Sequence, residues 1–163
     1  MMKSNDISVC LINKDSGNEI ARCLDSVKSF ADEIIVVDTG SEDNSPDLAR
    51  QYGAKLVSHR WSNDFSAARN VYLKAAQCSW ILVMDSDEVL DIDAATILKW
   101  ALAEQPKTAF FLNIHNYFHS DKMSCWSGPD DMTEEIMPGV SVSLSTSIRL
   151  FPKYSRIQYS YAV

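Results

Sequence analysis

Four acidic side chains follow an apolar run in the stretch WILVMDSDEVLD, residues 80–91: Asp85, Asp87, Glu88 and Asp91. The chain already carries a formal net charge of -7, so these neighbouring carboxylates repel one another unless a positive charge lies among them. Hard cations such as Mg²⁺ take one or two protein carboxylates together with substrate phosphates. Asp85 and Asp87, separated by the small Ser86, therefore predict a divalent-cation site that neutralises a diphosphate. The alternative is that such acids cap the next helix or occupy a solvated turn.

The segments that must position these acids alternate between strands and helices. Short apolar runs between polar breaks predict strands at 7–12, 34–37, 54–59 and 80–84. Apolar residues at helical spacing predict helices at 18–30, 45–53 and 65–77. Ser45 is expected to cap the second helix, with Pro46 at its first position and Gly53 closing it. This alternation predicts an α/β fold, a single domain with a mostly parallel central sheet and helices on both faces.

The remaining elements follow the acidic cluster. We expect a helix at 94–104, a strand at 109–118, a long loop at 120–139, and a half-exposed strand or hairpin at 140–151. Long loops without secondary structure often act as lids, so we expect the loop to order over a bound ligand. In the third predicted helix, helical spacing puts five apolar residues on one side: Phe65, Ala68, Val71, Tyr72 and Ala75.

Polar residues stand where three of the predicted strands end. Strand one is followed by Asn13, Lys14 and Asp15, strand two ends at Asp38, and strand four is followed by Asp85 and Asp87. Ligands of open α/β sheets bind beyond the carboxyl ends of the strands, where the strand order reverses. The three sets of side chains are therefore expected to meet at one edge of the sheet.

Composition limits the class of protein. The 163 residues are 46% hydrophobic and 23% charged, which is typical of one folded domain. A pI near 4.8 without a Lys/Arg cluster argues against nucleic acid as a partner. The sequence shows no transmembrane segment and no signal peptide, so we expect a cytoplasmic location. The four cysteines are scattered and are expected to be reduced, mainly in the core.

Four blocks of the chain resemble, in order and spacing, the N-terminal half of family-2 glycosyltransferases with the GT-A fold. They are ISVCLINKDSGNEIARCLDSV, DEIIVVDTGSEDNSPDLARQYGAK, DFSAARN and WILVMDSDE, between Ile7 and Leu90. The similarity is particularly close to bacterial lipopolysaccharide-core glucosyltransferases and related small cytoplasmic enzymes of cell-envelope polysaccharide synthesis. It implies a nucleotide-sugar-binding half at 1–90 and a partial acceptor half at 91–163.

The resemblance implies transfer of a sugar from a nucleoside-diphosphate sugar, usually a UDP-sugar, to an acceptor hydroxyl with inversion. Asp38 matches the acid that binds the nucleotide base, Asn13 belongs to the nucleotide-binding strand end, and Arg69 matches an arginine near the diphosphate. Asp85 and Asp87 match the D-x-D pair that binds Mn²⁺ or Mg²⁺. The acceptor, a saccharide or a lipid-linked molecule, is left open, as are the oligomeric state and a peripheral position at the inner face of the membrane.

Two departures from the family pattern affect the expected function. The family often has N-E-E after the first strand, where this chain has DSG at Asp15 to Gly17. The sequence ends at Val163, before a His-Glu pair that relatives carry, so we expect a form truncated at its C-terminus. An inverting transfer needs a general base. In the family this base is a carboxylate beyond the D-x-D pair, and no residue of this chain is assigned to that role. A non-catalytic nucleotide-sugar-binding remnant therefore stays open as the alternative to an active transferase.

Overall fold

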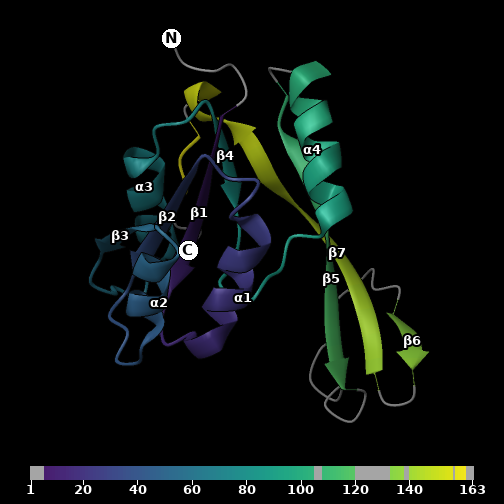
Figure 1. Ribbon diagram of the computed structural model, residues 1–163, viewed down its shortest axis with the longest axis horizontal. Coiled ribbons are helices and arrows are strands. Elements are labelled where there is room, and N and C mark those ends of the chain that lie inside the picture. Colours follow the sequence, from purple (N-terminus) through teal and green to yellow (C-terminus); the bar gives the residue numbers. More distant parts are fainter. Residues whose placement is uncertain (1–5, 105–107, 120–132, 138–139, 156, 161–163) are drawn as a thin grey trace. The chain divides into compact units, whose positions relative to one another are not determined.

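A computed structural model describes residues 6–104, 108–119, 133–137, 140–155 and 157–160 of the chain (Figure 1). By their internal contacts the residues form two units. The main unit comprises Met1–Ala109 and Leu150–Val163, and the β5–β7 unit comprises Phe110–Arg149. The nucleotide-sugar-binding and acceptor halves at 1–90 and 91–163 are defined by function, so their division stays a prediction.

The main unit is the expected alternation of strands and helices. Its elements are β1 (Ile7–Asn13), α1 (Gly17–Val27), β2 (Glu33–Asp38), α2 (Ser45–Gln51), β3 (Lys55–Ser58), α3 (Phe65–Ala75), β4 (Trp80–Val83), α4 (Ile92–Glu104) and a 3₁₀ turn at Lys153–Ser155. The strands lie in the order β3-β2-β1-β4, all parallel. The last residues of β7 (Val140–Pro152) pair antiparallel with β4. The predicted α/β fold with a mostly parallel sheet is thus confirmed.

Both faces of this sheet are covered by helices. Right-handed crossovers place α1 and α2 on one face and α3 on the other, because the strand order reverses between β3 and β4. On the α3 face, Cys10, Ile35 and Ile81 of the strands form one buried cluster with Ala68 and Tyr72 of the helix. Each fully buried large apolar side chain stabilises the fold by about 1.5 to 3 kcal/mol. Because the strands are apolar on both faces, their register is fixed. The positions of the residues at the strand ends are fixed with it.

The β5–β7 unit is built from strands. It contains β5 (Phe110–His119), β6 (Thr133–Met137) and most of β7, with β6 paired antiparallel to β7. The prediction of one loop at 120–139 is wrong for residues 133–137, because the pairing with β7 stabilises a segment, TEEIM, that has no strong strand pattern of its own. The other residues of the predicted loop, 120–132 and 138–139, and with them the predicted lid, lie outside the described residues.

The ends of α2 differ slightly from the prediction. Its N-cap is Asn44, and Ser45 is the first helical residue, fully buried. Ser45 does not cap because its hydroxyl donates to the side chain of Asp43. Gly53 does follow the helix with a φ of +77°, a conformation that other residues adopt only with strain.

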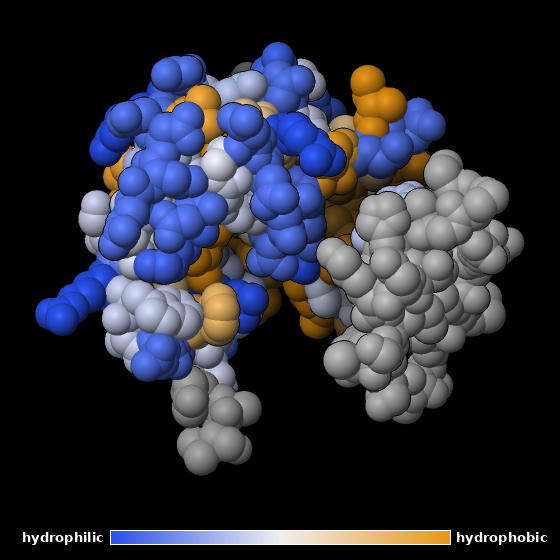
Figure 2. Space-filling model, turned by 90° about the horizontal axis from the view of Figure 1, so that it is seen from below, coloured by the Kyte–Doolittle hydropathy of each residue, from blue (hydrophilic) through white to orange (hydrophobic). Residues whose placement is uncertain are grey.

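The surface of the main unit is mostly polar. On the face shown in Figure 2, hydrophilic side chains cover most of the described surface, and apolar residues are exposed in smaller areas between them. Across the residues described here, every helix is too short or too polar to cross a bilayer.

Candidate functional site

The carboxyl ends of β1 and β2 are joined by backbone pairing. Asn13 lies opposite Asp38 in the register, and the N–H of Thr39 donates to the carbonyl of Asn13 over 2.9 Å. On the other side of β1 the paired strand is β4, whose next residue, Met84, donates its N–H to Cys10. Strands β2 and β3 follow on one side of β1, whereas β4 pairs with the other side of β1, so the strand order reverses at this point. The expected edge of the sheet is therefore a topological switch point, where ligands bind in folds of this class.

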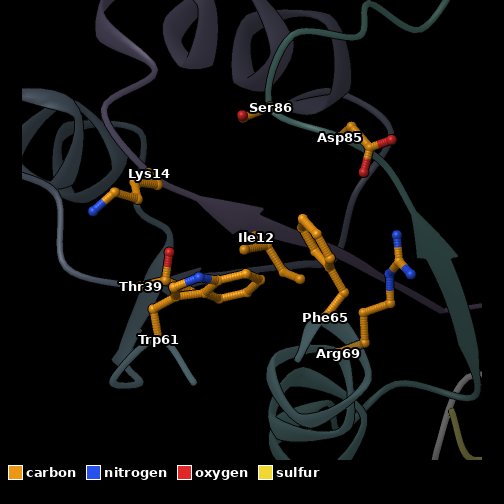
Figure 3. A pocket seen from close by; sticks show the side chains of 8 residues that line it. All are labelled: Ile12, Lys14, Thr39, Trp61, Phe65, Arg69, Asp85 and Ser86. Carbon is orange, nitrogen blue, oxygen red and sulfur yellow. The ribbon is translucent and has the colours of Figure 1, made fainter. Parts of the chain in front are cut away.

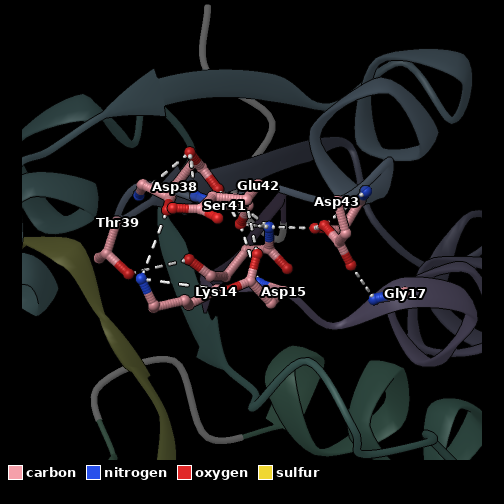
Figure 4. A network of polar contacts seen from close by, with 11 residues as sticks. Lys14, Asp15, Gly17, Asp38, Thr39, Ser41, Glu42 and Asp43 are labelled. Carbon is pink, nitrogen blue, oxygen red and sulfur yellow. Dashed lines mark hydrogen bonds and ion pairs between the residues drawn. The ribbon is translucent and has the colours of Figure 1, made fainter.

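Asp38 is the centre of a polar network at this edge (Figure 4). Its Oδ1 accepts hydrogen bonds from Asn13 Nδ2 at 3.0 Å and from Ser41 Oγ at 2.5 Å. Its Oδ2 accepts from the backbone N–H groups of Gly40 and Ser41, both at 3.3 Å. Asn13 is fully buried, and Asp38 is only 9% exposed. The carboxylate therefore orders the turn after β2. It lies behind the surface of the pocket that is described below.

A second set of contacts ties the β1–α1 loop to the β2–α2 loop. Asp15 donates its N–H to Ser41 Oγ over 2.9 Å and accepts the N–H of Glu42 on Oδ1 over 2.6 Å. In return, Asp43 Oδ2 accepts the N–H of Gly17 over 2.7 Å (Figure 4). The hydrogen bond from Ser45 is the main lowering influence on the pKa of Asp43. The DSG sequence that departs from the family pattern is thus a structural link between two loops.

A pocket opens between these loops and the end of β4. Its volume is about 280 Å³, close to the lower end of the range for small-molecule sites. It is lined by Ile12, Lys14, Thr39, Trp61, Phe65, Arg69, Asp85 and Ser86 (Figure 3). These residues come from the carboxyl ends of β1, β2 and β4, from the β3–α3 loop and from the first half of α3. The pocket is therefore at the switch point, as the sequence predicts for a ligand site.

Helix α3 supplies the aromatic and cationic part of the pocket. Asp64 caps the helix by accepting the N–H of Ala67 over 3.0 Å, which fixes where the first turn begins. Phe65 and Arg69, four residues apart, then lie on the same side of the helix. The Phe65 ring contacts Trp61 edge to face, with centroids 4.7 Å apart. Phe65 is 58% exposed, although it shares its side of the helix with the buried Ala68 and Tyr72.

The acidic cluster after β4 divides into structural and exposed side chains. Glu88 closes its own turn, accepting the N–H of Asp85 on Oε2 over 2.8 Å. Asp91 starts α4, since its Oδ1 accepts the N–H groups of Asp93 and Ala94 at 2.8 and 3.2 Å. Asp85 lines the pocket, where Figure 3 shows its carboxylate and the Arg69 guanidinium pointing toward one another. Asp87 is exposed and is not among the residues that line the pocket.

Glu88 and Asp91 thus accept hydrogen bonds within the protein, and the exposed Asp85 and Asp87 are the candidates for binding a ligand. Within the described part of the chain, no cluster of three or more His, Cys, Asp or Glu residues is arranged as a complete metal site. The donor set of Asp85 and Asp87 nevertheless fits a hard cation, since Mg²⁺ needs only one or two carboxylates when phosphate and water complete its coordination.

The buried thiol of Cys23 lies beneath this cluster. Its Sγ donates to the carbonyl oxygen of Asp85 over 3.5 Å. Burial, with the nearby carboxylates of Glu88, Asp87 and Asp85, raises the pKa of the thiol to about 12. Cys10 and Cys78 are also buried free thiols, which confirms the prediction of reduced cysteines for these three, whereas Cys125 lies outside the described residues. Cys23 therefore packs as a neutral side chain.

Comparison with known sequences decides the family. The sequence profile of "Glycosyl transferase family 2" matches residues 8–127. The chain belongs to glycosyl transferase family 2. This match spans β1 to β4, the pocket and α4.

Curated relatives match the chain over part of their own length. A TPR repeat-containing protein of Synechococcus elongatus is 48% identical over 105 residues, which are 64% of this chain and 26% of that protein. An uncharacterized glycosyltransferase of Rickettsia felis is 33% identical over 97 residues, 60% of this chain and 34% of that protein. The chain therefore spans well under half the length of these curated relatives.

Solved structures agree in fold. Staphylococcus aureus TarS in complex with UDP-GlcNAc has a TM-score of 0.51 at 24% identity, covering 61% of this chain and 31% of that one. The mannosyltransferase PcManGT of Pyrobaculum calidifontis, in complex with GDP-Man and Mn²⁺, has a TM-score of 0.50 at 22% identity, covering 58% and 32%. At this identity the likeness supports the GT-A fold alone.

Sequence reasoning selected only part of the pocket. Arg69 and Asp85 line it as expected, whereas Asn13 and Asp38 lie behind it and support its wall. Lys14 was expected at this edge without an assigned role, and the lining residues that the sequence-based prediction did not select are Ile12, Thr39, Trp61, Phe65 and Ser86. Trp61 carried one available signal, since an aromatic residue in a polar loop before a helix cap has no core to fill.

Proposed function

We propose that this family-2 chain transfers a sugar from a UDP-sugar to an acceptor hydroxyl with inversion and with the help of a divalent metal. The observation that carries the proposal is the pocket at the switch point, where Arg69 and Asp85 lie with the exposed ring of Phe65 and the half-buried ring of Trp61. A cation for phosphate, an acid for a metal and rings for stacking are the groups that a nucleotide-sugar requires.

Each proposed role follows from the position of a side chain. Arg69 binds the diphosphate, and Asp85 and Asp87 hold Mn²⁺ or Mg²⁺. Asp38 and Asn13 contribute to nucleotide binding by ordering the turn that carries Thr39 to the pocket. When bound, the metal stabilises the negative charge that develops on the departing diphosphate. The complexes of TarS with UDP-GlcNAc and of PcManGT with GDP-Man and Mn²⁺ support this choice of donor and metal.

The general base is not part of this assignment. The resemblance to lipopolysaccharide-core glucosyltransferases leads us to propose a saccharide or lipid-linked acceptor of the cell envelope, met in the cytoplasm or at the inner face of the membrane. Binding of a nucleotide-sugar without transfer is the second candidate function, because no general base is assigned among the described residues.

Calorimetric titration with UDP, with and without Mn²⁺, tests the proposal. We expect UDP to bind, and to bind at least about tenfold more tightly with Mn²⁺. Binding that is absent in both conditions contradicts the proposal. Release of UDP from a UDP-sugar in the presence of acceptor saccharides then separates a transferase from a binding unit, because a binding unit leaves the donor intact.

A further inference from the structure

The side chain of Arg69 is held between two aromatic rings that are far apart in the sequence. Its guanidinium carbon lies 5.6 Å from the centre of the Phe65 ring and 5.2 Å from the centre of the Tyr159 ring. Phe65 is one turn away on α3, whereas Tyr159 belongs to the last described segment, residues 157–160. A cation within about 6 Å of a ring centre is attracted to the face of the ring. Arg69 therefore depends on a segment that does not line the pocket.

Asn70, the next residue on α3, holds that segment in place. Its Nδ2 donates to the carbonyl oxygen of Tyr159 over 2.9 Å, and its Oδ1 accepts the N–H of Tyr159 over 3.0 Å. The amide side chain thus satisfies both backbone groups of one residue that lies 89 positions later. Such paired bonds fix orientation as well as distance. We call this pair of hydrogen bonds the Asn70–Tyr159 clip.

The ring of Tyr159 is also anchored on the core. It packs edge to face on Tyr72, with ring centroids 6.3 Å apart at 86°. Tyr72 is only 1% exposed and belongs to the buried cluster on the α3 face of the sheet, against which Ile157 and Tyr159 also pack. Because Tyr72 is immobilised by the core, Tyr159 offers Arg69 a fixed surface. A long flexible cation placed on a fixed surface loses rotamer freedom before any ligand arrives.

We propose that Asn70 and Tyr159 are positioning residues that hold the Arg69 guanidinium at the pocket for the diphosphate of the donor. This inference rests on the proposed function, because it takes the phosphates of a nucleoside diphosphate as the ligand of Arg69. Neither residue touches the ligand, and both act through Arg69. Their loss is therefore expected to weaken binding of the phosphates and to leave binding of the nucleoside unchanged.

The experiment compares UDP with uridine as ligands of Asn70→Ala and Tyr159→Leu, by NMR titration with Mn²⁺ present. We expect each variant to bind UDP about five- to tenfold more weakly and uridine as the wild type does. In an Arg69→Ala background, neither change should weaken UDP binding further. Lys74→Ala, which removes an exposed cation from the same helix, is the matched control and should bind UDP as the wild type does. Tyr159→Phe keeps the ring and should restore most of the affinity lost in Tyr159→Leu.

Equal loss of UDP and uridine affinity, or unchanged UDP affinity, overturns the proposal. A second measurement needs no ligand and separates this inference from the proposed function. The Nε–H proton signal of Arg69 is expected upfield in the wild type, because ring currents shield protons over aromatic faces. It should move toward the position of free arginine in Asn70→Ala, where the shielding by Tyr159 is lost and that by Phe65 remains. If the wild type binds no UDP, the proposed function fails. The clip is then judged by this signal, and an unchanged signal in Asn70→Ala overturns it.

Discussion

The ends of β1 and β2 and the end of β4 both carry acidic side chains, but the two regions use them differently. At the first, the carboxylates of Asp38 and Asp43 accept hydrogen bonds from neighbouring side chains and backbone N–H groups. At the second, Asp85 lines the pocket and Asp87 is exposed. Acids whose lone pairs are used within the protein determine the shape of loops, and acids that face solvent are available to a metal. Position at one edge of a sheet does not distinguish the two.

The largest effect on folding is expected at Asp38. Asp38→Ala removes the acceptor of two side-chain donors and two backbone N–H groups in a nearly buried turn. We expect a loss of about 2 to 4 kcal/mol in the free energy of unfolding, because buried donors without partners are costly. Chemical denaturation followed by circular dichroism measures this loss. A loss below about 0.5 kcal/mol would show that the turn does not depend on the carboxylate.

Asp87 is expected to give the opposite result. Asp87→Ala should change the free energy of unfolding by less than about 0.5 kcal/mol, since it truncates an exposed side chain. It should weaken Mn²⁺-dependent UDP binding at least about tenfold, or 1.4 kcal/mol, if the acid reaches the metal. Calorimetry with UDP and Mn²⁺ measures this effect. Asp93→Ala, another exposed acid of the main unit, is the control, and equal affinities of the two variants would remove Asp87 from the metal site.

Sequence patterns predicted the strands and helices of the main unit, because apolar runs and helical spacing are local signals. The parallel order of the strands then predicted that their carboxyl ends lie at one edge of the sheet. They placed Asn13, Asp38 and Asp85 correctly at one edge of the sheet. They did not reveal which acids were already satisfied, since Asn13, a partner of Asp38, and Glu42, a partner of Asp15, lie about 25 residues away in the chain. The exposure of Phe65 was not readable either, because helical spacing identifies one side of a helix but does not indicate where the core ends.

Asp91 belongs with the structural acids although it lies in the acidic cluster. Asp91→Ala removes the acceptor for two N–H groups at the start of α4 and should cost about 1 kcal/mol of unfolding free energy. UDP affinity should not change. Urea denaturation and calorimetry on the same preparation test both statements, and weakened UDP binding without loss of stability would move Asp91 to the ligand-binding group.

The smallest effect is a dependence on pH at Asp43. Hydrogen bonds, first from Ser45 and then from backbone N–H groups, hold the pKa of this carboxyl below its usual 3.8. A lowered pKa means that the ionised form stabilises the fold above about pH 3.8, and that this contribution is lost as the pH falls through the lower folded-state value. The urea midpoint of the wild type should exceed that of Asp43→Asn at pH 6. The two midpoints should converge as the pH is lowered further below 3.8, and a constant difference would contradict the assignment.

Reciprocal hydrogen bonds link the β1–α1 and β2–α2 loops into one structural unit. Asp15 bonds to the β2–α2 loop, and Asp43 bonds to Gly17. A chimera that receives only the β1–α1 loop of a relative with N-E-E at these positions would lose partners on both sides of the link. Exchanging the two loops together would preserve complementary partners. Engineers who wish to alter the donor preference of this chain should therefore treat residues 13–17 and 38–45 as a single cassette.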